Sequence, residues 1–181
     1  GRSLDLVRRF GAVRFEAVWV PRSELVGSLG GAALAVERQL QIAVVLQCAE
    51  TVGVLDEVFT TTLAYMNDRH AFGRPIASFQ ALKHRVADML LWLESAKATT
   101  DTAIAAVDAS THDAGLLSSV AKAYVADKAT TIIQDCMQLL GGISQTWEHD
   151  IHLFLRRATL NRALYGSPEW HRFRVADRLG F

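Results

Sequence analysis

The sequence predicts an all-α fold, an up-and-down bundle of four main helices followed by a short fifth helix. The three prolines, Pro21, Pro75 and Pro168, leave two long proline-free intervals, and proline is poorly tolerated inside helices. Within these intervals apolar residues recur at helical spacing. Helices joined by short connections pack as antiparallel neighbours, and this gives the up-and-down arrangement.

The segment before the bundle has a different pattern. Residues 13–20 alternate apolar and polar side chains before a closing apolar run, which is typical of a β-strand with one solvent-facing side. Glycines between residues 27 and 31 then indicate a flexible joint. We therefore expect a strand and a linker in residues 1–30, and the helical bundle in residues 31–181.

Capping residues set the expected helix boundaries. Serine, threonine and aspartate favour helix starts, and glycine favours helix ends. Gly73 and Pro75 mark the connection after the first helix, and Gly141 marks the end of the third. Proline suits a first helical turn, so Pro168 predicts the start of the fifth helix. The expected helices span residues 32–67, 78–108, 112–140, 148–164 and 168–177.

Charge and composition argue against several classes of partner. The formal net charge is zero, so no global field favours nucleic acid or an anionic membrane surface. No apolar run reaches the roughly 18 to 20 residues that span a bilayer. Cys48 and Cys136 are isolated and the histidines lack metal-ligand spacing, so we expect neither a disulfide framework nor a metal site. These features favour a reducing, cytoplasmic setting.

Four short motifs follow one another along the predicted helices. They are Arg69-His70-Ala71-Phe72-Gly73, Phe79-Gln80, Ala87-Asp88-Met89 and Gln138-Leu139-Leu140-Gly141-Gly142. In this order and at these separations they resemble the C-terminal helical domain of the acyl-CoA dehydrogenase family, especially its actinobacterial-type members. The resemblance covers residues 13–181. It implies that residues 1–30 are the end of the family's middle β-domain and the linker into the bundle.

The resemblance implies a flavoenzyme. Members of the family oxidise an acyl-CoA thioester to its α,β-enoyl form, with FAD lying partly across a subunit interface. We therefore expect FAD as the cofactor, an acyl-CoA substrate, an electron-transfer acceptor, and a homo- or hetero-tetramer. This chain is expected to hold the ADP half of FAD and to form one wall of the substrate pocket. It is not expected to turn over substrate alone.

Three candidate FAD contacts lie in or near the first motif. By resemblance, Arg69 reaches the FAD pyrophosphate of the neighbouring subunit, for which a guanidinium offers paired donors. Phe72 is expected to lie against the adenosine part of FAD, and Gln80 to donate a hydrogen bond near it. Plain alternatives stay open: a solvated arginine at a helix end, a phenylalanine that packs the loop against the core, and a surface amide.

A second group of candidate FAD contacts lies near the ends of the third and fourth helices. Gly141 and Gly142 lack side chains, so a phosphate or ribose can approach their backbone, with Gln138 one turn earlier as a donor. A plain helix C-cap is the alternative. Ser167 stands where the resemblance implies a threonine that contacts the adenine end of FAD. Glu169 stands where the family has a glutamine, and this departs from the pattern.

The catalytic base is the largest departure from the family. The reaction needs a carboxylate to remove the α-proton while hydride passes to the flavin. By resemblance, most members place a glutamate at the position of Tyr165, and a minority place it at the position of Ala43. Neither residue is acidic here. Glu50 lies seven residues beyond Ala43 on the same helix face, so it is the candidate base, with a structural glutamate as the alternative.

Two functional hypotheses follow. In the first, the chain is part of an acyl-CoA dehydrogenase with an unusual base. In the second, it is a non-catalytic helical partner or assembly subunit of a hetero-oligomeric acyl-CoA dehydrogenase. The residues at the two usual base positions support the second hypothesis. The retained Arg69, Gln138 and Gly141-Gly142 indicate that FAD binding is kept.

Overall fold

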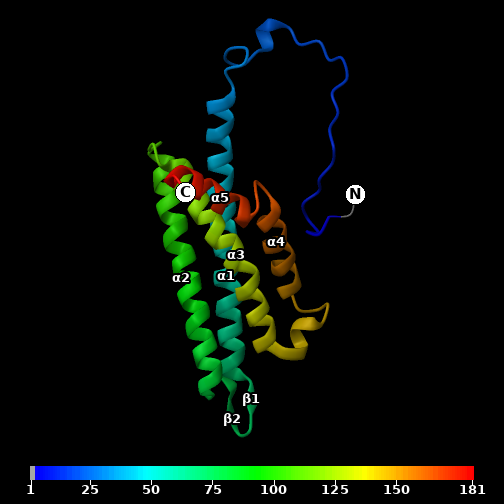
Figure 1. Cartoon of the computed structure of the whole chain (residues 1–181). Helices are drawn as coiled ribbons and strands as arrows, with labels where there is room; N and C mark the ends of the chain where they lie inside the picture. The colour runs from blue at the N-terminus through cyan, green and yellow to red at the C-terminus, as the bar shows by residue number, and fades with distance from the viewer. Residues whose placement is uncertain (1–2) are drawn as a thin grey trace.

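The computed structural model describes residues 3–181 and contains the predicted helical bundle (Figure 1). The three long helices are α1 (Ala33–Asp68), α2 (Gln80–Asp108) and α3 (Ala114–Leu140), and each runs antiparallel to the one before it. The shorter α4 (Ile151–Ala163) returns beside them, and α5 (Pro168–Leu179) lies across one end of the bundle. The all-α prediction is confirmed, and each predicted helix forms with ends within a few residues of those expected.

Short elements connect the helices. A hairpin with two antiparallel residue pairs, His70 opposite Pro75 and Ala71 opposite Arg74, joins α1 to α2. Its turn contains Phe72 at φ 52° and Gly73 at φ 77°, and left-handed backbone is most easily adopted by glycine. The connecting elements are η1 (Arg22–Glu24), β1 (His70–Ala71), β2 (Arg74–Pro75), η2 (Ile76–Ser78) and η3 (Gly141–Gln145).

The core of the bundle forms around α3, which contacts α1, α2, α4 and α5. Alanines on its buried face let the neighbouring helices approach closely, and burial of apolar surface contributes roughly 25 cal/mol per Å². The half of the core near the hairpin includes Leu55, Met66, Met89, Ile132 and Ile133. The half near α5 includes Val44, Val45, Ala96, Ala103, Ala121 and Val125.

The strand predicted in residues 13–20 does not form. These residues have no regular secondary structure, and the apolar side chains of Phe15 and Trp19 are exposed. In Figure 1 the segment arches away from the bundle before it enters α1. A strand needs a neighbour to pair its backbone groups, and within residues 3–181 the only sheet is the β1–β2 hairpin. The predicted division at residue 30 stays a prediction.

The turn between α4 and α5 positions one residue of the candidate site. Tyr165 has φ 59° and Gly166 has φ 104°. A Cβ atom at Gly166 would lie 2.5 Å from the Trp170 ring, so only glycine fits there. Ser167 then caps α5, because its hydroxyl accepts a hydrogen bond from the backbone N–H of Trp170 at 3.3 Å.

Within residues 3–181, no helix combines the length and the apolar character needed to cross a membrane.

Candidate functional site

A cavity of about 510 Å³ lies at the end of the bundle where α4 turns into α5. Ala43 and Glu50 line it from α1, and Tyr165 lines it from the turn. Seven residues make about two helical turns, so Ala43 and Glu50 share one face of α1. All three positions considered for the catalytic base therefore meet at one cavity, which we call the Tyr165 cavity. Its other lining residues are Arg8, Phe10, Leu46, Gln47 and Leu164.

Glu50 accepts four hydrogen bonds at the edge of this cavity. Arg8 Nη2 donates to both carboxylate oxygens at 2.8 Å. Arg157 Nη1 donates to Oε1 at 2.7 Å, and Asn161 Nδ2 donates to Oε2 at 2.9 Å. Burial raises the pKa of Glu50, but hydrogen bonds from Asn161 and Arg157 and the charges of both arginines outweigh burial and leave the pKa lowered.

These contacts oppose a role for Glu50 in proton transfer. An ionised carboxylate has about four lone-pair sites, and here four donated hydrogen bonds occupy them. A general base works best when its pKa lies near the operating pH. Catalysis by Glu50 stays a prediction, and its surroundings are those of a structural carboxylate.

Asp5 extends this ion-pair network, which the sequence analysis missed. Asp5 is buried and accepts a hydrogen bond from Arg157 Nε. It also accepts from the backbone N–H groups of Val7 at 2.8 Å and Arg8 at 3.2 Å. The hydrogen bond from Arg157 is the main cause that lowers the pKa of Asp5 to about 2. The network fastens this segment to α1 and α4, and no short-range motif in the sequence indicates it.

A buried lysine lies behind the Tyr165 cavity and was also missed. Lys122 on α3 is 2% exposed, and its Nζ donates to Gln47 Oε1 and to the backbone carbonyl of Asn161. Burial lowers the pKa of Lys122 to about 8. The signal available in the sequence was a lysine between alanines on the apolar face of a predicted helix.

A second cavity, of about 570 Å³, lies at the opposite end of the bundle beside the end of α3. Gln138, Gly141 and Gly142 line it, so the structure brings these three candidate residues together. Gly141 has φ 68° and ψ −144°, a conformation open mainly to glycine. Atoms at the Cβ positions of both glycines would meet nothing within 4 Å.

This cavity fits the ADP half of FAD in chemistry. Gln134, Gln138 and Gln145 surround it with side-chain amides, which can donate to phosphate and accept from ribose hydroxyls. The two glycines leave the backbone open to a close approach. We call it the Gln138 cavity.

Arg69, Phe72 and Gln80 lie around the hairpin at the same end of the bundle (Figure 1). All three are exposed, and Phe72 is 96% exposed. None of them lines the Gln138 cavity. Among the described residues, Arg69 makes no ion pair. Their roles, including contact with a neighbouring subunit's FAD, stay predictions.

Ser167 lies at the other end of the bundle from these residues, beside α5 (Figure 1). Its hydroxyl caps α5, so the structure assigns it a local role and does not bring it to the Gln138 cavity. Contact with the adenine end of FAD stays a prediction.

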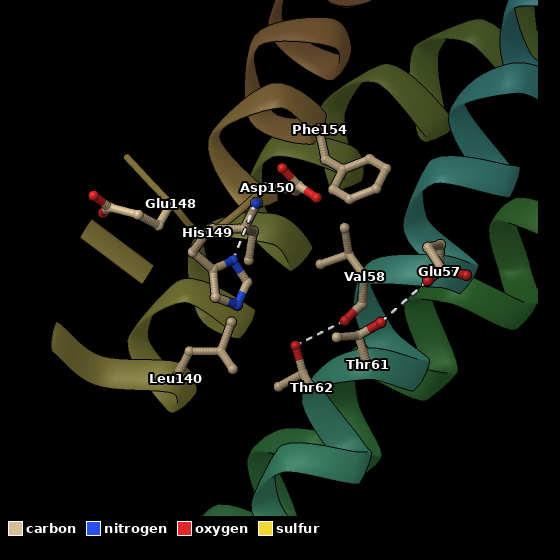
Figure 2. A pocket seen from close by; sticks show the side chains of 10 residues that line it. Glu57, Val58, Thr61, Thr62, Leu140, Glu148, His149, Asp150 and Phe154 are labelled. Carbon is tan, nitrogen blue, oxygen red and sulfur yellow. Dashed lines mark hydrogen bonds between the residues drawn. The ribbon is translucent and has the colours of Figure 1, made fainter. Parts of the chain in front are cut away.

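A third cavity, of about 350 Å³, lies between α1 and the start of α4 (Figure 2). Several of its polar side chains have local partners. Thr62 donates to the Val58 carbonyl at 2.7 Å, and Thr61 donates to Glu57 at 3.2 Å. His149 Nδ1 accepts from a backbone N–H at 3.1 Å. Within residues 3–181, no group of three or more His, Cys, Asp or Glu side chains is placed to hold a metal ion, and we assign this cavity no function.

Comparison with known proteins places this geometry in a family. The family model for the C-terminal domain of acyl-CoA dehydrogenase matches residues 30–180. Acyl-CoA dehydrogenase FadE34 of Mycobacterium tuberculosis is 43% identical over 138 residues, which are 75% of this chain and 19% of that protein. Acyl-CoA dehydrogenase IpdE2 of Mycolicibacterium smegmatis is 37% identical over 126 residues, 70% of this chain and 39% of that protein. The chain thus spans well under half the length of either relative.

Solved structures share the fold. PigA, in a structure with FAD and proline, has a TM-score of 0.86 at 26% identity, over 92% of this chain and 43% of that one. The acyl-CoA dehydrogenase of Geobacillus kaustophilus has a TM-score of 0.85 at 23% identity, over 92% of this chain and 44% of that one. The family and its flavoprotein neighbours support FAD as the cofactor. The chain belongs to the acyl-CoA dehydrogenase family, as a C-terminal helical domain of the actinobacterial type.

Proposed function

We propose that this chain is part of an FAD-dependent acyl-CoA dehydrogenase, which oxidises an acyl-CoA thioester to the α,β-enoyl-CoA and passes electrons to a separate acceptor. One observation carries the proposal. The Tyr165 cavity gathers both positions at which the resemblance implies a catalytic base, together with Glu50. In this proposal the Tyr165 cavity is one wall of the substrate pocket.

The chain's part in FAD binding follows from the second cavity. Gln138 donates to the ADP half of the cofactor, and the backbone at Gly141 and Gly142 lies against it. Arg69, on the exposed hairpin, is proposed to bind the pyrophosphate held by a neighbouring subunit, with Phe72 near its adenosine. Bound flavin supplies the hydride acceptor for the β-hydrogen of the substrate. This arrangement requires a homo- or hetero-oligomer.

The second candidate function is a non-catalytic subunit of a hetero-oligomeric acyl-CoA dehydrogenase. A specific observation favours it. Among the described residues that line the Tyr165 cavity, Glu50 is the one carboxylate, and four donated hydrogen bonds engage it. A partner subunit would then supply the base, while this chain contributes FAD contacts and the interface.

Flavin content and anaerobic reduction separate the two candidates. The full-length protein is purified alone and with candidate partner subunits, its flavin absorbance is measured, and acyl-CoA is added without oxygen. Bleaching of flavin in the protein alone supports the enzyme. Flavin that bleaches only when a partner is present supports the non-catalytic subunit. A protein that takes up no FAD in any pairing contradicts both.

A further inference from the structure

One polar group on the wall of the Tyr165 cavity lacks a partner. Gln47 lines the cavity from α1, one turn beyond Ala43, and is 6% exposed. Its Nε2 is buried and has no hydrogen-bond partner among the described residues. Buried polar groups are nearly always paired, so each exception needs an explanation.

Lys122 fixes which way the Gln47 amide faces. Its ammonium group donates to Gln47 Oε1, and an ammonium group has no lone pair with which to accept. The Gln47 amide must therefore present its oxygen to Lys122. Its N–H groups are left without an acceptor among the described residues, on a side chain that lines the cavity. Lys122 is itself held by the backbone carbonyl of Asn161, at the end of α4.

The other residues that line the Tyr165 cavity indicate which ligand would fit it. Phe10, Leu46 and Leu164 make part of the lining apolar, so a hydrocarbon chain can pack there. Gln47 Nε2 is already buried and unpaired, and an unpaired buried donor costs roughly 1–3 kcal/mol. An oxygen atom on the ligand at this point removes the cost. The cavity therefore discriminates between ligands that differ by one oxygen.

We propose that Gln47 donates a hydrogen bond to a hydroxyl or keto oxygen on the acyl chain of the bound thioester, and that Lys122 is the residue that positions it. The substrate class is then acyl-CoA thioesters that carry an oxygen substituent on the acyl chain. This inference rests on the proposed function, because it takes the Tyr165 cavity as the acyl pocket.

The test measures binding by titration calorimetry in the full-length protein loaded with FAD. The ligands are hexanoyl-CoA and a series of hexanoyl-CoA thioesters with one hydroxyl on successive chain carbons. We expect at least one hydroxylated ligand to bind more tightly than hexanoyl-CoA. The Gln47→Leu variant should reduce this preference by roughly tenfold to a hundredfold, while its affinity for hexanoyl-CoA is unchanged or improved.

Three further variants keep the result interpretable. Gln47→Glu retains the shape and the contact with Lys122 but removes the N–H donors, so it should lose the same preference even where Gln47→Leu folds poorly. Lys122→Met frees the amide to turn and should reduce the preference in part. Gln41→Leu is the matched control, because Gln41 lies on the same helix, outside the Tyr165 cavity, and pairs with Glu37.

Each outcome decides the inference. Equal weakening of every thioester by Gln47→Leu overturns it in favour of a contact with the thioester carbonyl. An unchanged preference in both Gln47 variants overturns it in favour of a cavity water as the partner of Gln47. A wild-type protein that binds FAD but none of the acyl-CoA ligands contradicts the proposed function itself, which is a distinguishable failure.

Discussion

Glu50 illustrates how the role of a single residue depends on contacts distant in sequence. Its position on α1, two turns beyond Ala43, makes it a candidate base. Its partners Arg8 and Arg157 lie in the N-terminal segment and in α4. Together with Asn161 they use the lone pairs that would take a proton. At this scale, a prediction from residue type and spacing finds the right cavity but leaves the role open.

Glu50→Gln should therefore affect stability more than chemistry. Glutamine keeps the shape but loses the charge that pairs with Arg8 and Arg157, which should lower the free energy of unfolding by about 1–3 kcal/mol. Turnover by the FAD-loaded full-length protein, measured with an acyl-CoA substrate, should fall less than tenfold. Glu57→Gln is the control, since Glu57 lies two turns further along the same helix and, among the described residues, its carboxylate is hydrogen-bonded only to Thr61 and forms no ion pair.

A large loss of turnover in Glu50→Gln would instead identify Glu50 as the catalytic base. A loss of turnover of roughly a thousandfold or more, with stability and acyl-CoA binding intact, is the signature of a removed general base.

At the scale of a single helix, the end of α3 shows which of its two glycines is needed to terminate it. Gly141 terminates the helix with a positive φ, and η3 then turns the chain towards α4. The sequence allowed two roles for this glycine pair, a helix C-cap and an FAD contact. The structure shows that the cap requires only Gly141, because Gly142 does not have a positive φ.

Alanine substitutions at the two glycines should consequently differ. Gly141→Ala forces a side chain into a strained conformation and should lower the free energy of unfolding by roughly 1–3 kcal/mol. Gly142→Ala meets open space and should change it by less than about 0.5 kcal/mol. Urea denaturation of the two variants measures the difference. Equal losses would show that the strain assigned to Gly141 is wrong.

At the scale of the whole molecule, α5 closes one end of the bundle through a buried histidine. His171 is 2% exposed, and its Nε2 lies 3.0 Å from the Tyr165 carbonyl. A carbonyl only accepts, so Nε2 carries the proton. Burial is the main cause that lowers the pKa of His171 to about 4. The same contact holds the turn that carries Tyr165 into its cavity.

This histidine should make the protein acid-sensitive. In the unfolded chain His171 takes up a proton as the pH falls through its usual pKa of 6.5, whereas in the folded protein it stays neutral until about 4. The free energy of unfolding should therefore fall between these pH values, by up to about 3 kcal/mol, because each pKa unit is worth about 1.4 kcal/mol. Urea denaturation at a series of pH values measures this slope.

The matched variants for the acid effect are His171→Phe and His112→Phe. The first removes the buried imidazole and should flatten the pH dependence. The second removes an exposed imidazole in the α2–α3 connection, two residues before α3 begins, and should keep the wild-type slope. Parallel slopes in wild type and His171→Phe would remove His171 as the source of acid sensitivity.

The sequence by itself determined the helices and the family. Apolar spacing, capping residues and the position of proline act within one or two turns, so the ends of α1 to α5 could be predicted from neighbouring residues alone. The motifs around Arg69 and Gln138 likewise lie in short runs. The strand in residues 13–20 was mispredicted because pattern alone does not supply the neighbouring strand that pairing requires.

Only the tertiary structure decided the surroundings of the candidate site. It joined Asp5 and Arg8 to Arg157 and Glu50, and it turned the Gln47 amide towards Lys122. These contacts span separations of 42 to 152 residues. Hydrogen bonds between such distant side chains exist only once the helices have packed, because packing alone sets which polar groups face one another and which are left for a ligand.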